Sequence, residues 1–266
     1  VVIPARYGSS RFPGKPLVRL CGKPMIQHVY ERARGSTGVT RVLVATDDQR
    51  IAETVTGFGG EVWFSTKPYR TGTDRVADAA RALPGDVFVN LQGDEIPLDP
   101  GLLSDLILPF LQSRAVMGTL MRPITDRDDL VNPSLVKVVT NAAGEALYFS
   151  RAPIPWVRDA QPGTVADALH YLHLGVYIYT RATLDRLAGL PTGPLEEAEK
   201  LEQLRALIHG LCIRVWETRR PSVRLDSPAD VESAEAALQR SQGRHLRLDH
   251  DQSILQGDKT MFTLRR

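Results

Sequence analysis

The sequence predicts an α/β fold with a mostly parallel β-sheet, and two features of the 266-residue chain carry this prediction. Apolar runs too short for helices alternate with segments of helical spacing through the first half of the chain. Glycines and polar residues punctuate the boundaries between them. Because β-α-β-α-β order favours parallel strands joined by right-handed crossovers, we expect a three-layer, Rossmann-like arrangement with ligands at the carboxyl ends of the strands.

The first strand covers Val1-Val2-Ile3, and a helix with apolar residues on one face begins near Met25. Residues 41–46 form a second buried strand. Asp47 then caps a helix that runs through Ile51 and Val55.

A short strand at 61–64 follows, and Thr71 or Thr73 opens a helix that ends near Leu83. Residues 86–91 complete the parallel series as another buried strand. A helix near 100–111 closes this half of the chain.

The second half changes pattern and predicts a smaller, embedded β-rich lobe. Strands are expected at 116–121, 135–140, 146–150 and 172–179, with a hairpin turn at 141–144. The segment 157–167 is polar and is expected to form a loop.

Helical spacing then predicts a helix from Leu195 to His209, followed by a strand at 213–217 and a last helix at 228–240. The remaining tail, 241–266, is polar and charged.

The composition argues against several classes of partner. Lys plus Arg total 33 against 31 for Asp plus Glu, so the net charge of +2 provides no global field for nucleic acid or membrane. Cys21 and Cys212 lie far apart without a metal-binding pattern, as expected for reduced thiols. No apolar run approaches the ~20 residues of a membrane span, and no signal peptide is visible. We therefore expect a cytoplasmic protein.

The most informative stretch is residues 1–24, VVIPARYGSSRFPGKPLVRLCGKP. Its loop combines Gly8 and Gly14 with the cations Arg6, Arg11 and Lys15, and seven basic residues but one acid occur between positions 6 and 34. Glycines allow close backbone approach and cations bind phosphate oxygens, so this imbalance suggests a polyphosphate site. The spacing fits neither a Walker A loop nor G-x-G-x-x-G. On its own, a solvated surface turn explains the loop about equally well.

A second candidate site, Gln92-Gly93-Asp94-Glu95, follows the strand at 86–91. An acid at the carboxyl end of a central parallel strand lies where Mg²⁺ is held against phosphates, because Mg²⁺ takes one or two carboxylates together with phosphate oxygens and water. The alternative is a turn that leads into the helix near residue 100.

These motifs carry a resemblance to a known family. P-A-R-Y-G-S-S-R-F-P-G-K-P followed by G-K-P-M-I resembles the N-terminal signature of the sugar nucleotidyltransferases, closest to the 3-deoxy-manno-octulosonate cytidylyltransferases. V-N-L-Q-G-D-E resembles their second motif, although Ile96 separates this motif from the usual Pro. The resemblance implies a nucleotide-diphospho-sugar transferase domain over 1–240, with a nucleotide-binding part (1–112), a sugar-binding and dimerisation lobe (113–195) and a return to the main sheet (196–240).

The resemblance also implies roles on the nucleotide side. R-T-G-T-D-R at 70–75 resembles S-G-T-E-R, and R-L-D-S-P resembles G-V-D-T-P, with Arg224-Leu225 in place of the small pair. Asp94 and Asp226 are then the Mg²⁺ ligands and, with Lys15, the catalytic residues. The residues expected to contact CTP are Arg6, Ser9, Arg11, Lys15, Thr73, Arg75 and Gln92.

On the sugar side, the resemblance rests on F-S-R followed by I-P-W, on H-L-G-V-Y, and on L-E-E-A-E-K-L-E-Q-L-R. A solvated arginine, a structural histidine and a charged helix face are the alternative interpretations of these three segments. The residues expected to bind the acid sugar are Arg151, His173, Tyr177, Glu202 and Gln203.

The implied activity is Mg²⁺-dependent transfer of CMP from CTP to the anomeric C2 hydroxyl of 3-deoxy-D-manno-octulosonate, with release of pyrophosphate, for the lipopolysaccharide core. A homodimer is implied as well. Two alternatives stay open: a cytidylyltransferase for another ulosonic acid, and a non-catalytic nucleotide-binding homologue.

Overall fold

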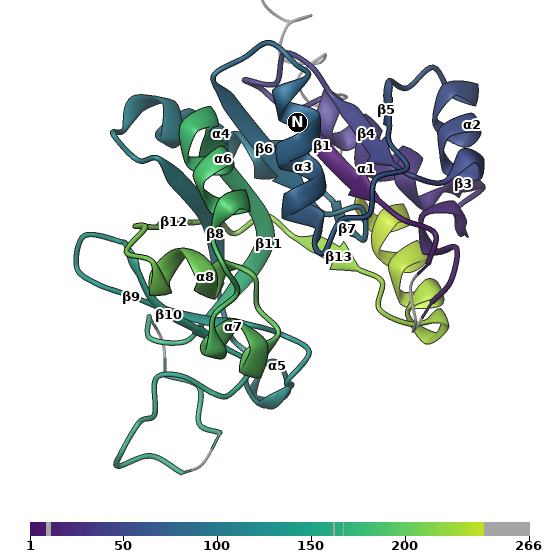
Figure 1. Cartoon of the computed structure of the whole chain (residues 1–266). Helices are drawn as coiled ribbons and strands as arrows, with labels where there is room; N and C mark the ends of the chain where they lie inside the picture. Colours follow the sequence, from purple (N-terminus) through teal and green to yellow (C-terminus); the bar gives the residue numbers. More distant parts are fainter. Residues whose placement is uncertain (9–11, 162, 167, 242–266) are drawn as a thin grey trace, which may run out of the picture.

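The computed structural model describes residues 1–8, 12–161, 163–166 and 168–241 of the chain. Its main sheet contains nine strands among these residues, and the parallel strands of the first half of the chain lie together at one end (Figure 1). β1 (Val2–Ala5) pairs in parallel with β4 (Leu43–Thr46) and β6 (Val87–Leu91), and β4 pairs in parallel with β5 (Val62–Phe64). The predicted parallel series is therefore confirmed.

Helices cover both faces of this sheet, as a three-layer fold requires. Neighbouring residues of a strand point to opposite faces, and those of β1 and β4 alternate accordingly between two hydrophobic clusters. One cluster includes α1 (Met25–Arg34), α2 (Gln49–Gly57) and α4 (Gly101–Gln112). The other includes α3 (Gly72–Arg81) and α6 (Arg181–Gly189).

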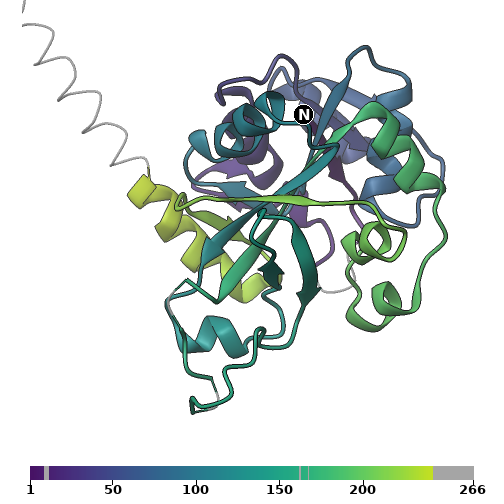
Figure 2. The same ribbon diagram turned by 90° about the vertical axis from the view of Figure 1, so that its left-hand side faces the viewer.

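The second half adds antiparallel strands to the same sheet. β11 (Tyr171–Thr180) pairs antiparallel with β6 on one side and with β8 (Met117–Pro123) on the other, and β8 pairs in parallel with β12 (Arg214–Glu217). β9 (Lys137–Thr140) and β10 (Ala146–Ser150) continue the sheet beyond β11. Together with α5 (Arg127–Val131), they extend away from the parallel half (Figures 1 and 2). The division of the chain into functional parts stays a prediction.

Several short elements surround the carboxyl ends of the parallel strands. The N-terminal loop ends in η1 (Lys15–Leu17) and a hairpin of β2 (Arg19–Leu20) and β3 (Lys23–Pro24). β7 (Glu95–Pro97) pairs antiparallel with β13 (Ser222–Arg224), and η2 (Pro228–Asp230) leads into a helix over 231–241. The tail prediction for 242–266 lies outside the described residues. No helix of the described part is long and apolar enough to cross a membrane.

Two local predictions were wrong: the residue that caps α2, and the single helix over 195–209. The cap of α2 is Asp48, whose carboxylate accepts a hydrogen bond from the Arg50 N–H at 3.0 Å, whereas Asp47 pairs with Arg75. The prediction for α3 is confirmed, because Thr71, one of its two predicted caps, accepts a hydrogen bond from the Asp74 N–H at 3.1 Å.

The predicted helix over 195–209 is in fact two helices, α7 (Pro194–Glu199) and α8 (Gln203–Ile208). Lys200 between them has a left-handed backbone with φ of 55°. The cause is a tertiary contact: the Glu199 carboxylate accepts hydrogen bonds from the Ser150 hydroxyl at 2.6 Å and from the Arg151 N–H at 2.9 Å. This contact fixes the end of α7 where helical periodicity alone would continue it.

Candidate active site

A cavity of about 710 Å³ opens beside the carboxyl end of β6. It lies between the parallel half and the segments 132–136, 172–177 and 200–203. The predicted site residues that line it are Thr73, Gln92, Asp94, Arg151, His173, Tyr177, Glu202, Gln203 and Asp226. The fold therefore gathers residues from widely separated segments around one space.

Asp94 lies at the centre of this arrangement. The Lys15 ammonium donates a hydrogen bond to the Asp94 carboxylate at 2.7 Å and another to the backbone carbonyl of Leu225 at 2.8 Å. The Leu225 N–H in turn donates to the carbonyl of Asp94 at 3.2 Å. These bonds join the N-terminal loop, the segment after β6 and the segment after β13 at one point.

Asp226 follows Leu225 and lines the same cavity as Asp94. The Arg224 guanidinium lies 3.2 Å from the Asp226 carboxylate, and the Asp226 N–H donates to Asp230 at 2.8 Å. Arg224-Leu225 replaces the small Gly-Val pair of the family motif, and Arg224 therefore brings a cation directly beside Asp226, a predicted metal ligand.

The two carboxylates fit a Mg²⁺ ion by the chemistry of their donor atoms, because Mg²⁺ prefers oxygen ligands and combines one or two carboxylates with phosphate and water. The described residues contain no group of three or more His, Cys, Asp or Glu side chains placed to bind a metal.

The N-terminal loop is closed by a hydrogen bond from the Gly14 N–H to the Tyr7 carbonyl at 2.9 Å. Gly14 has φ of 71°, and a Cβ atom at this position would lie 3.0 Å from the Tyr7 ring. Both facts require glycine here. The end of the loop positions Lys15 in contact with Asp94. Ser9 and Arg11 lie outside the described residues.

A smaller cavity of about 80 Å³ adjoins the first, and both are lined by Gln92 and Glu202. Arg6 and Arg75 also line the smaller one. Arg75 is buried, with 5% exposure, and its Nη2 donates to the Asp47 carboxylate at 2.7 Å. Of the predicted nucleotide residues that the structure describes, Thr73 and Gln92 line the large cavity, whereas Arg6, Arg75 and Gln92 line the smaller one.

Arg151, on the sugar side, lines the large cavity but is held by the protein. Its Nε donates to the Glu199 carbonyl at 2.7 Å, and its Nη1 donates to the Pro133 carbonyl at 2.9 Å. Arg151 therefore anchors the end of β10 to α7 and to the loop before β9, and Nη2 is the guanidinium nitrogen outside these bonds.

His173 and Tyr177 lie on β11 and are both buried. His173 Nε2 lies 3.1 Å from the hydroxyl of Thr119, and the ring packs against Phe149 and Tyr177. Burial, with a further contribution from the charge of Arg224, lowers the pKa of His173 to about 3. His173 is therefore neutral at physiological pH and suits hydrogen bonding better than proton transfer. Burial also raises the pKa of Tyr177, which stays protonated.

Glu202 and Gln203 lie at the start of α8. The helix is held by Arg205, whose Nε donates to Glu196 at 2.9 Å and whose Nη1 lies 3.8 Å from Asp74 of α3. This buried ion pair fixes α8 against α7 and the nucleotide side of the site.

Two buried charged residues of functional interest are not among the predicted site residues. Glu95 lines the large cavity. Lys137 does not line it but donates hydrogen bonds to the carbonyls of Asn132, Leu135 and Arg151, which do. A single charged residue inside an apolar run, as in Leu-Val-Lys-Val-Val at 135–139, is the signal that marks Lys137.

Comparisons with known proteins agree on one family. The sequence profile of the family described as cytidylyltransferase matches residues 1–215. The 3-deoxy-manno-octulosonate cytidylyltransferase of Syntrophotalea carbinolica is 49% identical over 242 residues, covering 89% of this chain and 97% of the relative. The 8-amino-3,8-dideoxy-manno-octulosonate cytidylyltransferase of Shewanella sediminis is 48% identical over 243 residues, covering 90% and 97%. A solved CMP:2-keto-3-deoxy-manno-octonic acid synthetase complexed with CTP is 41% identical, with a TM-score of 0.83 and coverage of 90% of this chain and 97% of that chain.

Proposed function

The chain belongs to the cytidylyltransferase family, and we propose that it transfers CMP from CTP to the C2 hydroxyl of 3-deoxy-D-manno-octulosonate. The observation that carries this proposal is the meeting of Lys15, Asp94 and the Leu225-Asp226 segment beside a single large cavity. One cation and two carboxylates at this point support the proposal, because a triphosphate and a divalent ion each need partners of opposite charge.

Asp94 and Asp226 would hold Mg²⁺, which when bound neutralises phosphate charge and lowers the pKa of the attacking hydroxyl. Lys15 donates two of its three N–H groups to the protein and offers the third to a phosphate oxygen. Arg6 at the rim of the smaller cavity supplies a second cation on the nucleotide side. Orientation and charge neutralisation by these residues supply most of the acceleration in phosphoryl and nucleotidyl transfer.

The acid sugar would occupy the other end of the cavity, between Arg151, His173, Glu202 and Gln203. The one guanidinium nitrogen of Arg151 outside its protein hydrogen bonds provides a donor for the carboxylate of the substrate. Because His173 is neutral, the proposal assigns it no role as general base. The proton of the attacking hydroxyl would pass to solvent water, since no side chain is assigned as its base.

A second substrate follows from a specific finding. The Shewanella sediminis relative acts, by its name, on the 8-amino analogue, and its identity of 48% is close to the 49% of the Syntrophotalea carbinolica relative. The two acids differ at C8, far from the reacting C2 hydroxyl. Transfer to the 8-amino acid is therefore the second candidate function.

A pyrophosphate-release panel tests these proposals. CTP and UTP are each combined with 3-deoxy-D-manno-octulosonate, its 8-amino analogue and a nine-carbon ulosonic acid, with and without Mg²⁺. We expect release with CTP, Mg²⁺ and an eight-carbon acid. Faster release with the 8-amino acid would favour the second candidate function. If no combination of nucleotide and acid releases pyrophosphate, the protein lacks this activity. The homodimer and the cytoplasmic location implied by the resemblance stay predictions.

A further inference from the structure

The smaller cavity is lined by a buried arginine, one of whose donors has no acceptor within the described part of the chain. Nη1 of Arg75 has no hydrogen-bond partner among the described residues, although Arg75 is 5% exposed. A buried N–H without a partner costs free energy, so such groups occur in native proteins mainly where a ligand or an ordered water completes them. Because Arg75 lines this cavity, the acceptor is expected there.

The guanidinium of Arg75 is held on two sides. Nη2 donates to the Asp47 carboxylate at 2.7 Å. The Tyr69 ring, which also lines the cavity, lies with its centroid 5.1 Å from Cζ of Arg75. This distance is within the range of a cation–π interaction, so the ring contributes to where the guanidinium lies.

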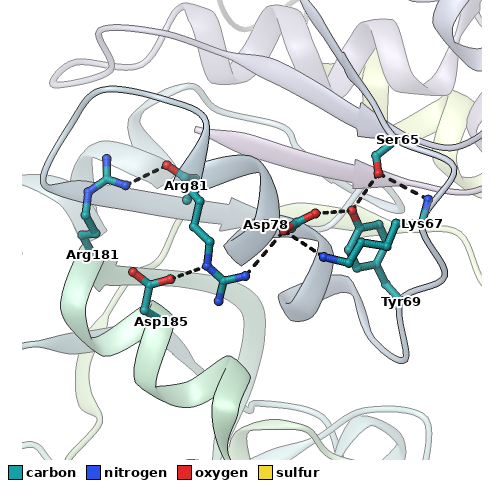
Figure 3. Close-up of polar contacts among 8 residues, drawn as sticks. Ser65, Lys67, Tyr69, Asp78, Arg81, Arg181 and Asp185 are labelled. Carbon is teal, nitrogen blue, oxygen red and sulfur yellow. Dashed lines mark hydrogen bonds and ion pairs between the residues drawn. The ribbon is translucent and has the colours of Figure 1, made fainter.

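The Tyr69 ring is itself fixed through its hydroxyl group. The hydroxyl donates a hydrogen bond to Asp78 at 2.6 Å and lies 2.9 Å from the Ser65 hydroxyl, as Figure 3 shows. Lys67 also reaches Asp78, at 3.2 Å. Because Asp78 belongs to α3, which also carries Arg75, this network holds the 65–69 segment against the helix.

We propose that Tyr69 is a positioning residue for the nucleotide, acting through Arg75. Its anchored ring holds the guanidinium so that Nη1 is available to an acceptor atom of the bound nucleotide. The inference rests on the proposed function, since it takes the occupant of the smaller cavity to be part of CTP. The acid sugar occupies the other end of the large cavity, so Tyr69 has no direct effect on it.

Calorimetric titration of CTP in the absence of acid sugar, together with steady-state KM values for both substrates, tests this proposal. Tyr69→Leu removes the ring face, and we expect CTP binding to weaken about 5- to 30-fold, the scale of one partly desolvated cation–π contact. The KM for the acid sugar should change by less than about twofold, since Tyr69 does not line the large cavity. Tyr69→Phe keeps the ring but loses the anchor and should weaken CTP binding by a smaller factor.

A double-mutant cycle separates positioning from a general structural role. In an Arg75→Gln background, Tyr69→Leu should weaken CTP binding by less than about twofold, because its effect passes through the missing guanidinium. Tyr30→Phe is the matched control: it also loses a hydrogen-bonded hydroxyl, which accepts from the Glu61 N–H at 3.2 Å, but Tyr30 lines neither cavity. This control should bind CTP like the wild type.

Three results would overturn the proposal: unchanged CTP affinity in Tyr69→Leu, an equal loss in the Arg75→Gln background, or equal losses for both substrates. If Tyr69→Leu does not fold, Tyr69→Phe and Asp78→Asn carry the same comparison, and unchanged CTP affinity in both contradicts it. Failure of wild-type protein to bind CTP at all would instead contradict the proposed function, so the two failures are distinguishable.

Discussion

Replacing Lys137 by methionine should destabilise the protein and weaken binding of the acid sugar more than binding of CTP. Lys137 is 0% exposed, and its ammonium donates to the carbonyls of Asn132 at 3.0 Å, Leu135 at 2.7 Å and Arg151 at 2.6 Å. All three of its N–H groups are thus used. Burial and the neighbouring Arg151 charge lower the pKa of Lys137, so the ion carries a desolvation cost that these three bonds offset.

The magnitude follows from these contacts. Each of the three buried carbonyls that loses its charged donor costs about 1–3 kcal/mol. Methionine also removes the cost of burying the ammonium, several kcal/mol by order of magnitude, and this offsets part of the loss. We expect a net loss of about 3 kcal/mol in the free energy of unfolding, typical of a broken buried network.

The effect on binding comes from geometry. Asn132, Leu135 and Arg151, whose carbonyls Lys137 holds, all line the large cavity on the sugar side. Because displacements near 1 Å can reduce catalysis by as much as ~10²-fold, we expect the KM for the acid sugar to rise about tenfold and the KM for CTP to change little.

Urea unfolding and steady-state kinetics measure both effects. Lys23→Met is the matched control, since Lys23 forms an exposed ion pair with Glu31 at 2.8 Å and should change stability by less than ~0.5 kcal/mol. Lys137→Met with unchanged free energy of unfolding would refute the role of its three bonds. Equal changes in both KM values would refute the placement of its effect on the sugar side.

Three further predictions concern the centre of the site. Asp94→Asn should reduce pyrophosphate release at least ~10²-fold, the scale of one lost electrostatic contact in a transition state, and normal turnover would remove Asp94 from the metal site. Arg224→Gly should lower the half-saturating Mg²⁺ concentration about 2- to 5-fold in activity titrations, because the guanidinium 3.2 Å from Asp226 competes for its carboxylate; an unchanged value would show no competition. His173→Gln should make unfolding less sensitive to acid. The pKa of His173 is about 3 in the folded protein against an ordinary value of 6.5, so below pH 6.5 only the unfolded state binds this proton and stability falls with pH. Urea unfolding at pH 7 and pH 5 should show the variant losing about 2 kcal/mol less than wild type, and equal losses would contradict a buried neutral imidazole.

The parallel half of the fold was predictable because its strands are buried on both faces. Residues 1–3, 42–45 and 87–89 are apolar throughout, and such runs need helices on both sides of the sheet. The structure shows this directly, since Ile3 and Val44 belong to one cluster while Val2 and Leu43 belong to the other.

The errors arose where a tertiary partner overrides a local preference. Asp47 and Asp48 are equally good caps by sequence, but Asp47 pairs with Arg75, 28 residues away. Likewise, Glu199 ends α7 because its carboxylate binds the end of β10. Local periodicity contains no information about either partner.

The gathering of the site residues depends on the buried carboxylate of Glu95, which belongs to the second candidate site but received no predicted role. Glu95 accepts a hydrogen bond from the Ser222 hydroxyl at 2.9 Å and another from the Gly175 N–H at 3.1 Å. Glu95 lies in β7, directly after Asp94. Its two bonds therefore connect β7 to β13, which precedes Asp226, and to β11, which carries His173. A Cβ atom at position 175 would lie 3.0 Å from the Glu95 carboxylate, so the middle glycine of H-L-G-V-Y makes room for this bond. The spacing of that motif is thus explained by a partner 80 residues earlier in the chain, which no local pattern encodes.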